Sequence, residues 1–299
     1  MNSTFKRWLP LALIIVSGVF ALVYTEHAHI ATPASPQPIL NAAADAQHEL
    51  TRVPAHISLM SDADEIRIGD DLAVHYIATE IPPGSSVTDL RSVEAYLQRI
   101  GQRTATHARR KLPWHFHYIP NKNFVNAFAL PGGHIFIGEG LLNLMHSEDA
   151  LSAVLGHEIE HVDLRHCAER VQAEQQMKNF GDLFSLPVQV FLAGYSKEQE
   201  LEADRDGITL AVDAGYSPLG LRDLLIEFQK LEPSTMPGPS NPIDEAAGLT
   251  LATLAGYFQS HPAASIRLQQ LDTLMAANHW LCPPLTPLNH SSDASDEGT

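Results

Sequence analysis

The chain has 299 residues, of which 44% are hydrophobic and 18% are charged, so it is long enough to bury a core and does not have the composition of a disordered tail. Its formal net charge is −16 with 19 Lys and Arg residues, which argues against a nucleic-acid partner, because such binding needs a dense basic face. Only two cysteines, Cys167 and Cys282, are present. This count excludes a disulfide-rich mini-fold and a four-cysteine metal site.

The N-terminus has the pattern of a membrane anchor. Lys6 and Arg7 precede an apolar run over residues 9–24, whose length lies between that of a signal peptide and that of a comfortable membrane-spanning helix. No convincing cleavage site follows this run. Residues 1–25 are therefore predicted to be a membrane anchor or an uncleaved signal segment, with the rest of the chain on the outer side of the membrane. The alternative is a buried helix of the folded domain.

Three regions follow the anchor. Residues 26–55 are rich in Pro and Ala and are predicted to be a linker, because this composition buries little apolar surface. Residues 56–280 are predicted to be the folded domain, which opens with helical patterns over 62–79 and 87–110. Residues 281–299 are polar and are predicted to be a disordered tail.

The apolar period changes inside the folded domain. Residues 115–119, 124–130 and 134–137 are predicted to be strands, and the sequence Pro131-Gly132-Gly133 forms a turn between the last two. The rest of the domain is predicted to be helical, apart from a loop rich in Pro and Gly at residues 233–242. The expected fold class is α+β, mostly helical with a small sheet.

One segment has the pattern of a metal site, His157-Glu158-Ile159-Glu160-His161. A spacing of four residues on a helix places both imidazoles on one face, where both reach a single ion, and Glu158 reaches the water bound to that ion. The alternative is a chance match in a chain with many histidines. Apolar residues at helical spacing around the motif predict that its helix is buried.

A catalytic zinc keeps three protein ligands and one open position, so a third ligand must come from another element. Glu200 and Asp204 share one face of a predicted helix. One of them would bind metal, while the other would hold a ligating imidazole through its second ring nitrogen. The alternative is a solvated acidic helix face.

Taken together, these motifs resemble peptidase family M48. The residues that carry the resemblance are, in chain order, Asn126-Ala127-Phe128-Ala129-Leu130-Pro131-Gly132-Gly133, Gly140-Leu141-Leu142, the motif helix, Glu200 with Glu202-Ala203-Asp204, and His261-Pro262 with Arg267. The resemblance implies a gluzincin metalloprotease domain over residues 56–280 that binds one Zn²⁺ per chain. By this resemblance His157, His161 and Glu200 are the zinc ligands, and Asp204 is the carboxylate behind them.

The resemblance also implies roles around the zinc. His261 and Arg267 match positions that approach the metal and steady the charge on the scissile carbonyl oxygen. In some periplasmic relatives the matching histidine occupies the open zinc position, which would make the resting enzyme latent; the alternative for His261 is a residue at a helix start. The strand residues expected to line the cleft and bind an extended peptide through backbone hydrogen bonds are Asn126, Ala127, Phe128 and Ala129, unless they form an ordinary hairpin strand.

The resulting hypothesis is a zinc-dependent endopeptidase in which Glu158 takes the proton of the zinc-bound water. The pattern is nearest the periplasmic branch of the family that includes BepA and LoiP. It implies a bacterial inner-membrane protein with a periplasmic catalytic domain, or a secreted periplasmic one if the N-terminal segment is cleaved. The expected substrates are misfolded or damaged envelope proteins. The alternative function is a zinc-bound periplasmic chaperone or assembly scaffold whose proteolysis is incidental.

Two further features of the sequence each have more than one interpretation. Cys167 and Cys282 either form a disulfide in an oxidising compartment or remain unpaired thiols. Residues 172–182 and 186–195 are predicted to form a helical excursion between the ligand segments, which is a lid, a membrane-facing surface or part of the core. No role is assigned to His166, and the oligomeric state is not predicted.

Overall fold

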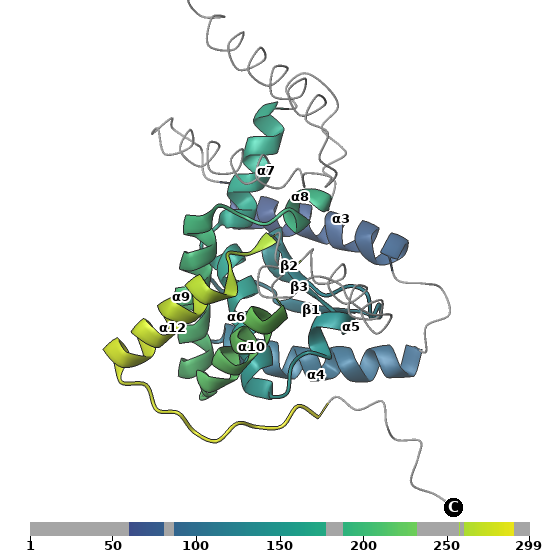
Figure 1. The fold of residues 1–299 in the computed structure, drawn as a ribbon. Coiled ribbons are helices and arrows are strands. Elements are labelled where there is room, and N and C mark those ends of the chain that lie inside the picture. Colours follow the sequence, from purple (N-terminus) through teal and green to yellow (C-terminus); the bar gives the residue numbers. More distant parts are fainter. Residues whose placement is uncertain (1–59, 81–86, 178–187, 232–256, 258–259, 290–299) are drawn as a thin grey trace, which may run out of the picture. The chain divides into compact units, whose positions relative to one another are not determined.

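The structure is a computed structural model, and its fold is drawn in Figure 1. The residues that it describes are 60–80, 87–177, 188–231, 257 and 260–289. The predicted anchor, the predicted linker and the loop at 233–242 lie outside these residues. Among the described residues no helix is both long and apolar enough to cross a membrane.

The described chain is mostly helical and has one small sheet, which confirms the predicted α+β class. The elements before the motif helix are α3 (Asp62–Glu80), α4 (Val87–Ala105), β1 (His115–Ile119), β2 (Ala127–Leu130), β3 (His134–Gly138) and α5 (Glu139–Leu142). The motif helix is α6 (Glu148–Asp163), and it is followed by α7 (His166–Met177), α8 (Gln189–Leu192), α9 (Lys197–Asp213), α10 (Leu219–Leu231) and α12 (Ala264–Asn278).

The sheet has the strand order β1-β3-β2, with β1 parallel to β3 and β2 antiparallel to it. The connection from β2 to β3 is the turn Pro131–Gly133, where Gly132 has a φ of 77° and Gly133 a φ of 107°. Residues other than glycine rarely adopt these left-handed values. The sequence Pro-Gly-Gly therefore permits the tight return that places β2 at one edge of the described sheet.

The first two helices of the described chain, α3 and α4, cover opposite faces of the sheet (Figure 1). On the α3 side, the Tyr76 ring packs edge-on against Phe128 and Phe136, with 5.2 Å between ring centroids in each pair. On the α4 side, Gly101 leaves room for the Phe116 ring, which lies 2.3 Å from the position a Cβ would occupy. The sheet is therefore covered on both faces: all the residues of β2 and β3 are buried, whereas three of the five residues of β1 are exposed or half-buried.

Helix α6 is central, because all of its residues are buried. Ser147 caps its N-terminus, because the Ser147 Oγ accepts a hydrogen bond from the Ala150 amide at 3.1 Å. Helix α6 contacts α4, α9, α10 and β2. The close approach to α9 depends on two glycines, because a Cβ on Gly156 would lie 2.4 Å from the Gly207 carbonyl oxygen. This crossing lies directly beside His157 and brings the metal motif to α9.

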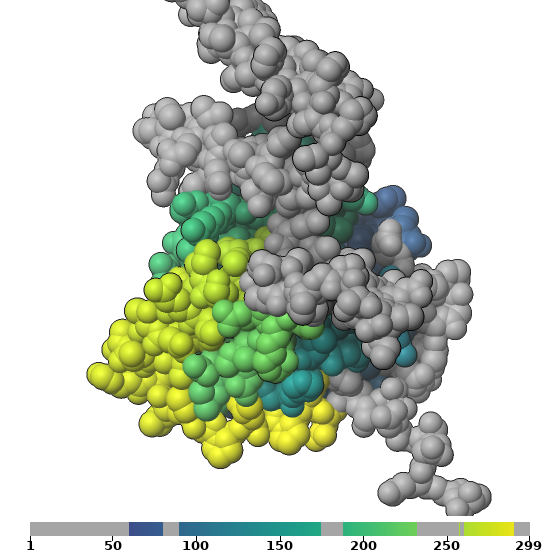
Figure 2. Space-filling model, viewed as in Figure 1, coloured from purple at the N-terminus to yellow at the C-terminus, as the bar shows by residue number. Residues whose placement is uncertain are grey.

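Helices α10 and α12 complete the described core, and they lie side by side on one face of the molecule (Figure 2). The segment after α12 requires a correction to the predicted disordered tail. The amide of Thr286 donates to Asp149 Oδ2 at 2.7 Å, and the Thr286 carbonyl accepts from the Glu148 amide at 2.9 Å. Pro287 also forms a β-bridge with Ser147. Residues 281–289 are thus held in place by hydrogen bonds to groups at the start of α6, and composition does not reveal such contacts. Residues 290–299 lie outside the described chain.

Candidate metal centre

Helices α6 and α9 bring three donor residues together. The Nε2 atoms of His157 and His161 lie 3.0 Å apart. Glu200 Oε2 lies 3.4 Å from His157 Nε2, and Glu200 Oε1 lies 3.7 Å from His161 Nε2. Two ligands of a tetrahedral zinc are about 3.3 Å apart, given usual bond lengths near 2 Å. Two imidazoles and a carboxylate at these distances fit one zinc ion.

The crossing of two buried helices explains the convergence. His157 and His161 are one helical turn apart on α6, so their rings project from the same face. Glu200 lies in the first turn of α9, whose start is fixed by a capping box between Ser196 and Gln199. The three donor side chains are at most 5% exposed. Such burial is costly for polar groups unless each has a partner.

Asp204 supports the first histidine. Its Oδ1 lies 2.9 Å from His157 Nδ1, so the ring nitrogen that faces Glu200 is free to offer its lone pair. Arg267 holds the same carboxylate with two hydrogen bonds, 2.8 Å from Nε and 2.6 Å from Nη2. Burial opposes ionisation of Asp204, but Arg267 and His157 more than offset it, and the pKa of this carboxyl stays well below its usual range.

Glu158 lies beside the donor set and is also buried. Burial raises the pKa of its carboxyl; His157 opposes the shift, and Glu200 adds to it, which leaves the pKa at about 7. One Glu158 oxygen is within 4.8 Å of ring nitrogens of both His157 and His261. A carboxylate with a pKa near neutrality is suited to accept a proton and release it again.

A comparison with known protein families agrees with this site. The model of peptidase family M48 matches residues 91–275, which is more than half of the chain. The chain belongs to this family. The matched range contains the sheet, the motif helix and all the donor residues, so the resemblance expected from the sequence motifs is confirmed.

Three curated relatives illustrate the similarity. The beta-barrel assembly-enhancing protease of Escherichia coli (strain K12) is 27% identical over 191 residues, which cover 56% of this chain and 38% of that protein. The mitochondrial metalloendopeptidase OMA1 of Schizosaccharomyces pombe is 28% identical over 199 residues, which cover 59% of this chain and 51% of that protein. The putative beta-barrel assembly-enhancing protease of Vibrio cholerae is 30% identical over 145 residues, which cover 40% of this chain and 30% of that protein. The chain therefore spans about half or less of the length of these relatives.

The other two M48 positions predicted from sequence, His261 and Arg267, also converge on the site. His261 Nδ1 lies 2.6 Å from Glu200 Oε2, and the rings of His261 and His157 are 5.1 Å apart. Burial lowers the pKa of His261, although Glu200 opposes the shift. Arg267 reaches the donor set through Asp204, and its guanidinium also hydrogen bonds to the Tyr257 hydroxyl.

Two residues at the site have no motif that would reveal them. The Tyr195 ring stacks on His161 at 4.1 Å between centroids, and its backbone N–H donates to Glu200 Oε1 at 3.1 Å. His166, to which the sequence assigns no role, is buried and places its Nδ1 3.1 Å from His161 Nδ1. His166 follows His161 by five positions, a spacing that is not typical of one helix face. A backbone donor such as that of Tyr195 has no sequence signature.

The predicted peptide-binding strand lies near the site but does not contact the donor residues in the described hydrogen bonds. Asn126 Oδ1 accepts from the Ala127 amide at 3.0 Å. The Cys167 thiol lies 3.7 Å from the Ala129 carbonyl oxygen and 3.1 Å from the Tyr195 hydroxyl. Cys167 and Tyr195 thus connect the strand to His161. Cys167 is buried while Cys282 is exposed, and both are free thiols, so this structure has no disulfide between them.

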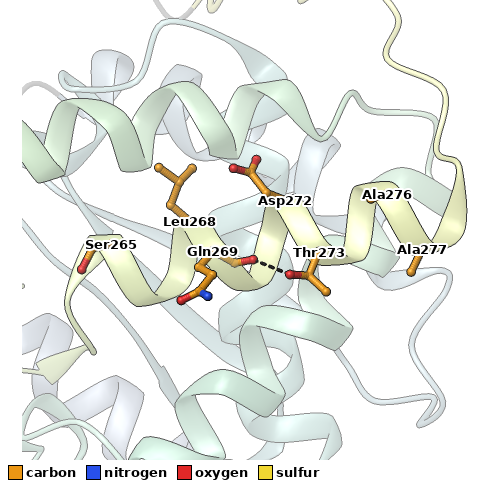
Figure 3. Close-up of a pocket in the computed structure, with 7 residues that line it drawn as sticks. All are labelled: Ser265, Leu268, Gln269, Asp272, Thr273, Ala276 and Ala277. Atoms are coloured by element: carbon orange, nitrogen blue, oxygen red, sulfur yellow. Dashed lines mark hydrogen bonds between the residues drawn. The ribbon is translucent and has the colours of Figure 1, made fainter.

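A pocket on α12 is separate from the metal centre. Figure 3 shows that its lining side chains come from this one helix: Ser265, Leu268, Gln269, Asp272, Thr273, Ala276 and Ala277. None of them belongs to the predicted site. The lining contains one carboxylate and several small residues, which do not form a catalytic group.

Proposed function

We propose that this M48 protein is a zinc-dependent endopeptidase. The observation that carries the proposal is the convergence of His157, His161 and Glu200, with donor atoms 3.0–3.7 Å apart and Glu158 buried beside them. These three residues would hold one zinc ion per chain. When bound, zinc supplies a Lewis acid that polarises the scissile carbonyl and makes water acidic enough to react at neutral pH.

The chain's own residues would carry the proton transfers. Glu158 would accept the proton of the attacking water and pass it to the leaving amine, and a pKa of about 7 suits both steps. Asp204 would keep the Nδ1 proton on His157, so that Nε2 remains the metal-binding atom. Arg267 would act as a positioning residue, because its contacts with the site run through Asp204.

His261 would control access to the site. Its hydrogen bond to Glu200 and its ring beside His157 support a role for His261 as the fourth zinc ligand in the resting protein. A histidine in that position competes with water or substrate, so the resting protein would be latent. Release of His261 would then precede the reaction.

Substrate would bind as an added strand on β2, which lies at the edge of the described sheet. The Asn126 carbonyl oxygen accepts from the Gly138 amide of β3, whereas the amide of Ala127 is held by the Asn126 side chain. Because backbone groups alternate in direction along a strand, Ala127 and Ala129 present theirs to the outer edge. An extended peptide would replace the Asn126 side chain at the Ala127 amide.

The proposed substrates are misfolded or damaged envelope proteins, and the proposed location is the bacterial periplasm, with residues 1–25 in the inner membrane. The name of the Escherichia coli relative, the beta-barrel assembly-enhancing protease, supports an envelope role. Backbone recognition by a strand also favours unfolded substrates, because it needs an extended segment rather than a particular side chain.

The test is degradation of casein by the full-length protein loaded with zinc. Glu158→Gln should lower the rate about a hundredfold or more, since general-base catalysis contributes that much, while zinc binding persists. Glu160→Gln is the matched control, because Glu160 is also buried on α6 but pairs with Arg109 at 2.8 Å. It should bind zinc and cleave casein.

His261→Ala should cleave faster than wild type if His261 keeps the protein latent. Equal rates for wild type and His261→Ala would contradict latency but not the protease. If neither of them cleaves casein while each binds zinc, the endopeptidase proposal for unfolded substrates is wrong, and the scaffold function would be preferred.

A further inference from the structure

The two histidines of the motif are supported differently. His157 has a carboxylate behind it, Asp204, which is itself held by Arg267. His161 has no carboxylate at its Nδ1 in the described hydrogen bonds; the atom 3.1 Å away is His166 Nδ1. His166 is 4% exposed, so this contact is formed away from bulk water.

A reversal of the chain after α6 places the His166 ring beside His161. Helix α6 ends at Asp163, and Arg165 then adopts a φ of 68° before α7 begins at His166. This left-handed conformation is unusual for arginine and needs support from its surroundings. The Arg165 side chain supplies it by donating to Asp62 at 2.6 Å and to the Met60 carbonyl at 3.0 Å. The turn is therefore tied to the start of α3, and it returns His166 to the motif helix.

The contact between the two rings has a defined direction if His161 binds metal. A neutral imidazole has one N–H and one lone pair. If His161 Nε2 offers its lone pair to zinc, its proton lies on Nδ1, and His166 Nδ1 must then be the acceptor. The proton of His166 would lie on Nε2, where Glu202 Oε2 is 3.7 Å away. That distance is too long for a hydrogen bond, but the carboxylate still attracts the N–H.

We propose that His166 is a positioning residue that accepts the Nδ1 proton of His161 and so orients this imidazole for zinc. The inference rests on the proposed zinc site. In that site, His166 would accept the Nδ1 proton of His161, as Asp204 would accept the Nδ1 proton of His157. A neutral acceptor adds no second negative charge behind the metal, in a site that already contains Glu200, Asp204 and Glu158.

The test separates hydrogen bonding from packing. His166→Phe keeps a ring of similar shape but removes the acceptor. His166→Asn loses the ring but places Oδ1 where Nδ1 was, since both atoms are bonded to Cγ. The full-length variants are stripped of metal, and their zinc dissociation constants are measured by competition with a chromophoric chelator. Circular dichroism and thermal unfolding of the metal-free proteins check that each variant folds.

We expect His166→Phe to weaken zinc binding about 10- to 100-fold, as loss of a partner behind a ligating histidine usually does, and His166→Asn to recover most of that loss. Zinc binding by His166→Phe that equals wild type, or binding by His166→Asn that is weaker than by His166→Phe, would overturn the inference and indicate packing. If His166→Phe does not fold, His166→Leu replaces it, because Leu matches Asn in shape and lacks the acceptor. Failure of wild type to bind zinc would instead overturn the proposed function.

Discussion

Asp204 contributes both to the proposed metal site and to the stability of the fold. It accepts from His157 Nδ1 on one side and from Arg267 on the other, and all three side chains are almost fully buried. Taking the charges of Asp204 and Arg267 out of water is expensive, and each is tolerated only because the other compensates it. Removing one partner would therefore leave an uncompensated buried charge.

We predict that Arg267→Met destabilises the metal-free protein by about 3–5 kcal/mol, the usual result of breaking a buried ion pair from one side. The measurement is urea unfolding followed by circular dichroism. Arg222→Met is the matched control, because Arg222 also pairs with an aspartate, Asp272 at 2.9 Å, but both side chains are more than a third exposed. It should cost less than about 1 kcal/mol. Equal losses of unfolding free energy in the two variants would show that the buried pair of Arg267 and Asp204 stabilises the fold no more than an exposed ion pair does.

Spacing and resemblance predict His157, His161 and Glu200 as a donor set, and the structure brings ligand atoms of these three residues within 4.8 Å of one another. His157 and His161 are one turn apart, and Glu200 and Asp204 are likewise separated by four residues, so each pair shares a helix face whatever the tertiary fold. His166 could not be found in this way. Its position depends on the chain reversal at Arg165, which is held by contacts to α3 about a hundred residues earlier in the sequence.

At the scale of elements, the crossing of α6 and α9 is the feature that assembles the site. Gly156 and Gly207 face each other, and a Cβ on Gly207 would lie 2.5 Å from the backbone nitrogen of His157. Backbone atoms cannot move aside as a flexible side chain can. The helices must therefore separate to admit even one methyl group, and this separation would carry Glu200 away from the histidines.

Gly207→Ala should thus destabilise the protein, although alanine favours an isolated helix by about 1 kcal/mol. Overpacking of a well-packed interface costs typically about 1–3 kcal/mol, and here the contact is with backbone, so we expect the steric cost to exceed the gain in helix propensity. Urea unfolding and the zinc dissociation constant measure the two consequences. Thr209→Ala, on the same helix but less buried, should change the free energy of unfolding by no more than about 0.5 kcal/mol. A stabilised Gly207→Ala variant that binds zinc normally would contradict the proposed role of the crossing.

The elements themselves were predicted better than their arrangement. The strand predicted at 115–119 has these bounds in the structure, and the strand predicted at 134–137 extends to Gly138. The strand predicted at 124–130 begins only at Ala127. The turn at Pro131–Gly133 predicts a hairpin, and β2 and β3 do pair antiparallel. The parallel pairing of β1 with β3 had no local signal, because its register depends on contacts with α3 and α4.

At the scale of the whole molecule, a chain of polar contacts joins the sheet to α3 on the face away from α4. His134 Nε2 lies 2.8 Å from Asp70 of α3, and His134 Nδ1 lies 3.0 Å from His117 Nε2 on β1. The His115 ring stacks on His134 from the same face. If His134 donates to Asp70 and accepts from His117, the two rings need only their two neutral-state protons. Each added proton would bring positive charge into this half-buried stack.

These contacts predict a pH dependence of stability. Burial, together with the neighbouring His134 and His115, lowers the pKa of His117 from 6.5 to about 3. Between these two values the unfolded chain binds a proton at His117 and the folded chain does not. Acid therefore favours the unfolded state, and the free energy of unfolding should fall as the pH decreases from about 6.5 towards 3.

The prediction is tested with His117→Phe, which keeps an aromatic ring against Phe136. In the wild-type structure the centroids of the His117 and Phe136 rings are 4.4 Å apart. The variant should lose stability at neutral pH, because His134 Nδ1 loses its partner, but its stability should fall less steeply with acid than that of wild type. Urea unfolding of the metal-free proteins at a series of pH values gives both quantities, and comparing variant with wild type cancels the titration of groups at the metal centre. His107→Gln removes an exposed histidine and should keep the wild-type slope. A slope in His117→Phe equal to that of wild type would mean that the histidine stack does not couple folding to pH, and that the acid sensitivity of the fold arises elsewhere.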